Sequence, residues 1–293
     1  MFFVSLLIEG SLAGLLYALV ATAFVVVYKA SRVINFALGE WVMVAAILVA
    51  MGNNVLGLGL AGALAFGCIG MAVLAWVFNT IALNRLVGQP LIAVLMVTLG
   101  LGVLLRGLGQ LLFSDVPRDI PLPLPTEPFV LAGLYVPGDK LAAAALAAVA
   151  TALMAWFMQR SRSGVALRAI ADDQKVAMAL GIDVNRYVTL AWCLSGALCV
   201  MAGSLWTFII GSGFGMGLVG LKIFPIVIIG GLDSIGGAII AAVMIGLIES
   251  LATGYLEPIL GSGCGLLAAY IALIVMLTVR PYGLFGERRV DRV

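Results

Sequence analysis

Histidine is absent from this chain of 293 residues, and charged residues make up only 10% of it. The chain has four cysteines, which lie in apolar runs and form no CxxC pair. Because metal sites are built mostly from His and closely spaced Cys, we expect no metal site and interpret the cysteines as small buried apolar residues. The sequence also lacks GxSxG and HExxH motifs and a facing pair of aspartates within its apolar runs. An intramembrane enzyme is therefore not expected.

Apolar residues are abundant instead: 63% of the chain is hydrophobic, and the mean hydropathy is +1.21. A soluble domain is about half apolar and about a quarter charged, so its core could not hide this much apolar surface. Spanning the roughly 30 Å of bilayer hydrocarbon takes about 20 apolar residues in a helix. The sequence therefore predicts an all-α, polytopic transmembrane helical bundle of about eight hydrophobic segments. We place them at 3–28, 36–52, 56–81, 90–113, 140–159, 187–209, 217–252 and 266–279.

Lysines and arginines in short loops predict the side of the membrane that each loop occupies. Five of them fall in the loop 160–186, and the tail after 279 is also basic. We therefore expect the C-terminus in the cytoplasm and the N-terminus outside. The first residues carry Glu9 and no basic cluster, so the first apolar run is expected to be a retained membrane helix, not a signal peptide. The net charge of +2 is scattered over helix ends and gives no indication of nucleic-acid binding.

The segment 217–252 must begin and end outside if helix 187–209 runs outward and the tail is cytoplasmic. It is therefore expected to be a broken or re-entrant hairpin, or a full pair of crossings, with its turn at 230–237 (GGLDSIGG). Irregular backbone within a membrane is tolerated where it is buried in protein or lines a cavity, and broken helices often line the binding sites of transporters. A plain glycine-rich cytoplasmic turn explains the same residues.

Charged residues inside apolar segments are costly and indicate functional sites by default. The sequence places Glu40, Arg106 and Glu249 in such positions. The alternative for Glu249 is a carboxylate at the outer interface of the membrane. The alternative for Arg106 is a side chain bonded to the carbonyls of neighbouring helices.

The stretch 28–44 (YKASRVINFALGEWVMV) interrupts the apolar pattern with four polar residues, of which Lys29 and Arg32 are interpreted as cytoplasmic anchors. Asn35 is well placed to N-cap the next helix, and Glu40 lies close enough to that helix's start to favour its dipole. The stretch is therefore either a helix boundary alone or also part of a gate.

The loop 160–186 is predicted to contain a helix of about two turns, with Asp172 as its N-cap and Gly181 as its C′ residue. Val176, Ala177 and Leu180 give that helix an apolar face. Such a helix suits docking into a groove of a soluble partner, and the alternative is an interfacial helix that lies on lipid.

Residues 168–182 (RAIADDQKVAMALGI) resemble the coupling segment of ABC importer permeases, in the version found in branched-chain amino acid permeases of the LivH type. Three more motifs of that family occur in the family's order: R-x-I-N-F-A-x-G-E at 32–40, a glycine-rich hairpin at 230–238 and R-P-x-G-L-F-G at 280–286. The chain departs from the family at Leu38, where a His is usual, and at Asp233, where a Gly is usual.

This resemblance implies a single permease domain over 1–293, with its coupling segment at 160–186, in the inner membrane of a bacterium. It implies a permease subunit that forms the pathway for branched-chain or related amino acids. The implied partners are a second related permease subunit, two cytoplasmic ATPase subunits, a periplasmic or extracellular substrate-binding protein and membrane lipid. No cofactor is expected in this chain, which has no GxxxxGK[ST] loop, so ATP is expected to bind to the ATPase subunits.

Three groups of residues are predicted to form the functional sites. The substrate pathway or gate comprises Asn35, Gly39, Glu40, Arg106 and Glu249; ATPase coupling involves Arg168, Asp172, Asp173, Ala177 and Gly181; and the hairpin contains Gly230, Gly231, Asp233 and Gly237.

Two alternatives stay open. One is a permease of the same family for amides or urea, because much of the selectivity in such systems resides in the binding protein. The other is a secondary transporter. It would need ion- or proton-coupling groups in its core, and the absence of His and the few acids in the spans argue against it.

Overall fold

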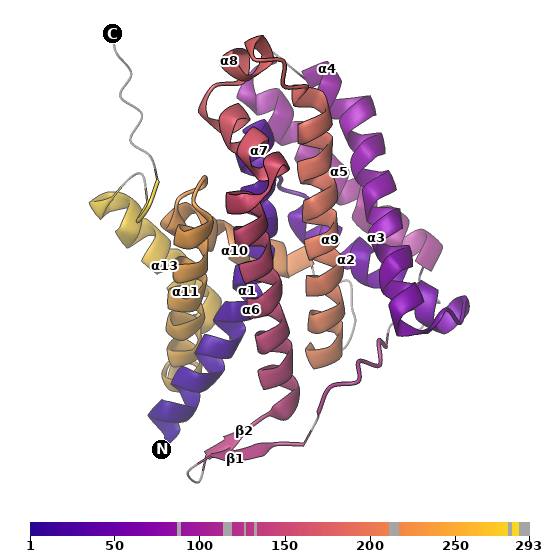
Figure 1. Ribbon diagram of the computed structural model, residues 1–293. Helices are drawn as coiled ribbons and strands as arrows, with labels where there is room; N and C mark the ends of the chain where they lie inside the picture. Colours follow the sequence, from indigo (N-terminus) through magenta and orange to yellow (C-terminus); the bar gives the residue numbers. More distant parts are fainter. Residues whose placement is uncertain are drawn as a thin grey trace. The chain divides into compact units, whose positions relative to one another are not determined.

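The computed structural model describes residues 1–86, 89–113, 119–125, 127–131, 134–210, 217–280 and 283–286. Helices dominate these residues, which confirms the all-α prediction (Figure 1). The first half contains α1 (Phe2–Ser31), α2 (Leu38–Ala50), α3 (Gly59–Phe78), α4 (Asn84–Leu86) and α5 (Leu91–Phe113). The second half contains α6 (Gly138–Arg160), α7 (Arg162–Asp172), α8 (Gln174–Ala179), α9 (Val184–Ile210), α10 (Gly217–Gly230), α11 (Ile235–Tyr255), α12 (Glu257–Leu260) and α13 (Cys264–Val279).

Four short elements supplement the helices in the described part of the chain. Two π-helical turns, η1 (Met51–Val55) and η2 (Asn79–Leu83), extend α2 and α3. Strands β1 (Phe129–Leu131) and β2 (Leu134–Val136) pair antiparallel, with Phe129 opposite Val136. This hairpin was not predicted, because three-residue strands leave no readable alternation of apolar and polar residues.

Seven described helices are long and apolar enough to cross a membrane. They are α1, α2 with η1, α3 through α4, α5, α6, α9 and α11, whereas α10 and α13 are shorter apolar helices. The predicted segments therefore agree with the structure within a few residues at each end. The predicted broken segment 217–252 consists of α10 and α11, joined at residues 231–234.

The chain forms two compact units. Unit 1 comprises the described residues of Met1–Val25, Leu124–Val149 and Lys222–Val293, and unit 2 those of Val26–Pro123 and Ala150–Leu221. The chain passes from one unit to the other within α1, between Pro123 and Leu124, within α6 and within α10. The single permease domain over 1–293 stays a prediction about function.

Glycines bring two helices of unit 1 into backbone contact. A Cβ atom added at Gly246 of α11 would lie 2.4 Å from the carbonyl oxygen of Gly10 in α1. One added at Gly14 would lie 2.7 Å from the Cα of Val243. Small residues permit such close contact between membrane helices, and α11 packs against α13 as well.

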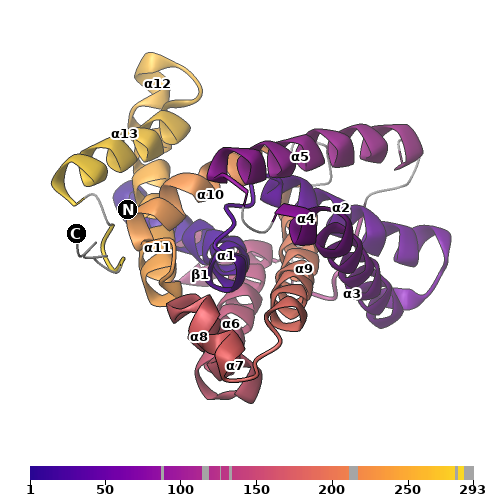
Figure 2. The ribbon, with the colours of Figure 1, turned by 90° about the horizontal axis from the view of Figure 1, so that it is seen from above.

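In unit 2, helices α2, α3 and α9 pack side by side (Figure 2). The Trp192 ring of α9 lies between two aromatic rings, with its centroid 5.2 Å from that of Trp41 in α2 and 5.1 Å from that of Phe78 in α3. Such tilted aromatic contacts add to the stabilisation that burial provides. Helix α5 packs along α2 and brings Arg106 into contact with Glu40.

Candidate functional site

Helix α2 begins well inside the apolar part of unit 2. Ser31 ends α1, and residues 32–37 reach Leu38 without forming a helix. Along this connection the Thr98 hydroxyl of α5 donates to the Ile34 carbonyl at 3.3 Å. Further along α5, Arg106 meets Glu40 in the first turn of α2. Arg106 lies roughly 22 Å along the helix axis from the start of α5, so α2 begins beside the interior of that helix.

The prediction that Asn35 N-caps α2 is wrong. The N-cap residue is Ala37, and no side chain caps the helix. Instead the Asn35 Oδ1 accepts a hydrogen bond from the Ala37 amide at 3.0 Å, which forms an Asx turn directly before the helix. Asn35 is 1% exposed, and its Nδ2 has no hydrogen-bond partner among the described residues. Sequence spacing could not distinguish the two arrangements, because both place an Asn just before a helix.

Glu40 and Arg106 form an ion pair that joins two helices of unit 2. The Arg106 Nη2 lies 2.6 Å from the Glu40 Oε1. The Glu40 side chain is 11% exposed and the Arg106 side chain 45% exposed. The partner of Arg106 is thus a carboxylate rather than the carbonyl of a neighbouring helix that the alternative interpretation required. The structure therefore brings two of the predicted pathway residues into direct contact.

Gly39 lies in the same first turn, next to backbone from another helix. A Cβ atom added at Gly220 of α10 would lie 2.8 Å from the Gly39 nitrogen and 2.9 Å from its Cα. On α5, a Cβ atom added at Gly102 would lie 3.3 Å from the Glu40 Oε2. Glycines on two neighbouring helices therefore leave room for the backbone and carboxylate at the start of α2.

Glu249 lies in a different cluster, within unit 1. Its Oε2 accepts a hydrogen bond from the Tyr17 hydroxyl at 2.8 Å, and its Oε1 forms an ion pair with the Lys222 ammonium. Lys222 also donates to the Tyr17 hydroxyl at 3.2 Å. Tyr17 is 3% exposed. The prediction that Glu249 belongs to the pathway is not tested by these contacts, which all lie within unit 1.

Sequence reasoning missed Lys222 and Tyr17. Lys222 is the one charged residue in the apolar run of α10. A charge inside a predicted span is the signal by which the sequence analysis selected Arg106, and it applies equally to Lys222. Tyr17 gave no such signal, because a tyrosine is an ordinary residue in an apolar helix. Only the packing of α1 against α11 shows that its hydroxyl reaches a carboxylate.

The coupling segment contains two helices where one was predicted. Helix α7 extends to Asp172, so Asp172 is not an N-cap. Asp173 both ends α7 and caps α8, and its Oδ1 accepts from the amides of Lys175 at 2.8 Å and Val176 at 3.1 Å. Two adjacent aspartates are equivalent as capping residues in a sequence pattern. The backbone decides between them, because Asp173 has the extended conformation of a cap.

Gly181 ends α8 as predicted. It has a φ of +83°, its amide donates to the Met178 carbonyl, and the Ile182 amide donates to the Ala177 carbonyl. This pair of bonds is a Schellman motif. The Ala177 side chain is buried, whereas Val176 and Leu180 of the predicted apolar face are exposed. Arg168, in α7, is partly buried and donates to the Gln159 carbonyl at 3.1 Å.

Arg32 connects the coupling segment with the connection that leads to α2. Its guanidinium donates a hydrogen bond to the carbonyl of Ala171, near the end of α7. The last carbonyls of a helix lack intrahelical partners and carry its negative dipole end, so a cation there is stabilising. Arg32 has a φ of +54°, which is uncommon for a residue other than glycine. Two motifs that are far apart in the sequence therefore meet in unit 2.

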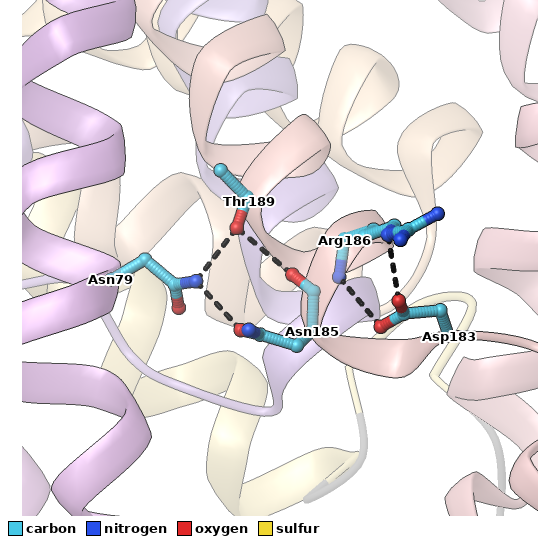
Figure 3. Close-up of polar contacts among 5 residues, drawn as sticks. All are labelled: Asn79, Asp183, Asn185, Arg186 and Thr189. Atoms are coloured by element: carbon cyan, nitrogen blue, oxygen red, sulfur yellow. Dashed lines mark hydrogen bonds and ion pairs between the residues drawn. The ribbon is translucent and has the colours of Figure 1, made fainter.

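A cavity of about 900 Å³ borders α8 in unit 2. The described residues that line it include Arg32, Leu83, Lys175 and Met178. At its edge the Asn79 Nδ2 of η2 donates to the Asn185 Oδ1 at 2.8 Å and to the Thr189 Oγ1 at 2.6 Å (Figure 3). On the side that faces this cavity, α8 borders open space rather than packed core.

The glycine-rich hairpin meets the C-terminal motif in unit 1. The Leu284 amide donates to the Ile229 carbonyl at 2.7 Å, and the Phe285 amide donates to the Gly230 carbonyl at 3.3 Å. A Cβ atom added at Gly237 would lie 2.0 Å from the Gly230 oxygen, so the two sides of the turn are in backbone contact.

The turn itself lies where the sequence predicted it. Gly231 has a φ of +100°, which favours glycine, and the Ser234 side chain caps α11 by accepting from the Gly237 amide. Asp233 lies in the turn, between the end of α10 and the start of α11. Pro281 of the C-terminal motif lies outside the described residues.

The chain belongs to the family described as branched-chain amino acid transport system / permease component, whose model matches residues 6–279. It is therefore a multi-span membrane protein and a component of a transport system rather than a catalytic enzyme. Over 323 residues it is 27% identical to the high-affinity branched-chain amino acid transport system permease protein LivH of Salmonella typhimurium, covering 100% of this chain and 98% of the relative. It is 29% identical to BraD of Pseudomonas aeruginosa, a permease protein of the same description, and the alignment covers 98% of this chain and 97% of BraD.

Two further likenesses are partial or distant. The probable branched-chain amino acid transport permease protein LivH of Methanocaldococcus jannaschii is 38% identical over 133 residues, which are 44% of this chain. The solved structure of PsaBC from Streptococcus pneumoniae in complex with Fab aligns over 94% of this chain at 16% identity, with a TM-score of 0.48, too low to bear on function.

Proposed function

We propose that this chain is the permease subunit of an ATP-driven importer that takes up branched-chain amino acids. The observation that carries the proposal is the family match over residues 6–279, together with relatives named as branched-chain amino acid permeases that align over nearly their whole length. The lack of a phosphate-binding GxxxxGK[ST] loop supports a division of labour in which other chains bind ATP.

The proposed assembly contains a second related permease, two cytoplasmic ATPases and a periplasmic or extracellular substrate-binding protein. Helix α8 is the proposed contact with an ATPase. Its Ala177 is buried, while Val176 and Met178 of the helix and Leu180 directly after it have exposed apolar side chains. An exposed apolar patch on a short rigid helix suits a groove on a partner.

The proposed coupling route runs from α8 through α7 to the start of α2. Closure of the ATPases on ATP would displace α8, which borders the cavity and is not packed against core on that side. The bond from Arg32 to Ala171 would pass this displacement to residues 32–37, which end at the first turn of α2. We propose that Asn35, Gly39, Glu40 and Arg106 lie on the substrate pathway there.

The proposed location is the inner membrane of a bacterium, with the N-terminus outside and the C-terminus in the cytoplasm. The basic loop 160–186, which contains α7 and α8, supports this orientation. Reporter fusions at residues 1 and 139 and within 160–186 test it, because the first two must report the outside and the third the cytoplasm.

Purification of the tagged chain from its native membrane tests the assembly. We expect ATPase subunits to co-purify. We also expect proteoliposomes of the complex to accumulate labelled L-leucine when ATP and the binding protein are supplied. Excess urea and acetamide serve as competitors, and stronger inhibition by either than by L-isoleucine would favour the amide or urea permease. Uptake by the chain alone under an ion gradient would establish a secondary transporter instead.

A further inference from the structure

The Glu40–Arg106 pair has hydrogen-bonding capacity that the described residues leave unused. A guanidinium has five N–H donors and a carboxylate has two oxygens. In the part of the chain that the structure describes, Arg106 contacts Glu40 through Nη2 and Oε1 alone. The Glu40 Oε2 accepts no hydrogen bond there. A desolvated charge pair is stabilising only when its remaining donors and acceptors are also satisfied. Both charged groups can therefore take a further polar partner.

The start of α2 adds donors at the same place. The first amides of a helix have no intrahelical acceptor, and no side chain caps those of α2. The hydrogen bond from the Ala37 amide to the Asn35 Oδ1 holds the Asn35 side chain against this turn. The Nδ2 of the same side chain, which has no partner among the described residues, therefore lies at the start of α2. A buried amide without a partner is rare in proteins, because it loses its hydrogen bonds to water. These donors and the positive end of the helix dipole suit a carboxylate.

We propose that the first turn of α2, with Asn35, Glu40 and Arg106, binds the zwitterionic end of a free α-amino acid. The carboxylate of the ligand accepts hydrogen bonds from Arg106 and the Asn35 Nδ2, at the positive end of α2. The ammonium donates to Glu40, whose Oε2 is available. This site rests on the proposed function, to which it adds a binding site for the substrate within the permease.

Charge balance selects a zwitterion over an anion or a cation. The pair carries one positive and one negative charge, and a zwitterion supplies one of each, so the occupied site stays neutral within the apolar unit. A monocarboxylate would draw Arg106 from Glu40 and leave the Glu40 charge without a partner, and an amine would do the reverse to Arg106. An unpaired charge inside a membrane protein is costly.

Ligand competition tests the site without any mutation. The chain, with the subunits that co-purify with it, is reconstituted in nanodiscs without the binding protein, and binding of labelled L-leucine is measured. We expect saturable binding. We also expect 3-methylbutylamine, which lacks the carboxylate, and 4-methylpentanoate, which lacks the ammonium, to compete about tenfold or more weakly than unlabelled L-leucine. Equal competition by all three compounds would overturn the proposal.

Two variants add a test in which the direction of the change is informative. Glu40→Gln removes the partner of the ammonium, so the preference should shift toward 4-methylpentanoate. Arg106→Gln removes a partner of the carboxylate, so the preference should shift toward 3-methylbutylamine. We expect L-leucine to bind about tenfold or more weakly to each variant. A structural defect lowers all affinities without these opposite shifts, and unchanged preferences in both variants contradict the proposal.

Glu9→Gln is the matched control, because Glu9 forms an ion pair with Lys140 at 3.2 Å in unit 1. It should leave the preference among the three compounds unchanged, and a shift as large as that of Glu40→Gln would overturn the proposal. If either site variant fails to assemble, the competition on the unmodified chain decides. Absence of saturable L-leucine binding, with uptake driven by ATP and the binding protein intact, would overturn this site alone. Saturable binding without such uptake would contradict the proposed importer instead.

Discussion

An ion pair between charged residues of apolar helices occurs in each unit of this protein, Glu249 with Lys222 in unit 1 and Glu40 with Arg106 in unit 2, and these two pairs differ in how fully they are hydrogen-bonded. In unit 1, both oxygens of Glu249 have partners, Lys222 and Tyr17, and these two partners also contact each other. In unit 2, Glu40 and Arg106 share one contact, and the Arg106 side chain is 45% exposed.

This difference indicates different roles for pairs of the same chemical type. A closed network of three side chains has little capacity for another ligand, and it lies where glycines hold α1 and α11 in backbone contact. Such a network stabilises one arrangement of helices. An incompletely bonded pair beside an uncapped helix start has capacity for a ligand. The degree of hydrogen-bond satisfaction, rather than the presence of a charge, therefore distinguishes the two clusters.

The largest effect on stability is expected for Lys222→Met. It leaves the Glu249 carboxylate without its cation, at a cost of about 3 kcal/mol. The double variant Lys222→Met/Glu249→Gln removes both charges and should recover most of the loss. Thermal unfolding of the purified complex measures both effects. A double variant no more stable than the single one would show that the charge is not the cause.

Arg106→Met should act more on transport than on stability. Since this side chain is nearly half exposed and makes one contact, we expect a smaller stability loss than for Lys222→Met. Uptake of L-leucine per assembled complex should fall about tenfold or more, because a charged ligand partner is lost. Uptake assays normalised to complex yield test this. If the yield of assembled complex fell while the remaining complex took up L-leucine normally, the Glu40–Arg106 pair would have a structural role, as the Glu249–Lys222 pair does.

Tyr17→Phe should cost about 1 kcal/mol of stability, because it removes a part-buried hydrogen bond to a carboxylate that keeps its Lys222 partner, together with the bond that the hydroxyl accepts from Lys222. Thermal unfolding measures it, and the additional loss in the Lys222→Met background reports the coupling within the cluster. Independent, additive losses would show that the cluster is not a cooperative network.

The smallest effect is expected for Asp173→Ala, which tests unit 2 at a distance from its ion pair. Loss of the cap should destabilise α8 by about 1 kcal/mol. Faster hydrogen exchange at the amides of Lys175 and Val176 reports it. Asp172→Ala is the matched comparison, because Asp172 caps neither helix. Equal acceleration in both variants would show that the cap does not hold this helix.

Much of the fold followed from composition and hydropathy, because bilayer thickness sets the length of a membrane helix. The spans, the hairpin turn at Gly231 and the C′ residue Gly181 agree with the predictions, since each depends on local residue chemistry. The N-cap predictions for Asn35 and Asp172 were wrong by one or two residues, because neighbouring residues share the same propensity and the backbone geometry decides between them.

The sequence by itself determined the class of protein, the number of spans to within one or two, and the presence of Glu40, Arg106 and Glu249 in apolar segments. Tertiary structure alone decided which charges meet: Glu40 with Arg106 in unit 2, and Glu249 with Lys222 and Tyr17 in unit 1. The physical reason is that hydropathy is a property of each segment. A partner 66 or 232 residues away is chosen by helix packing, which no local pattern encodes.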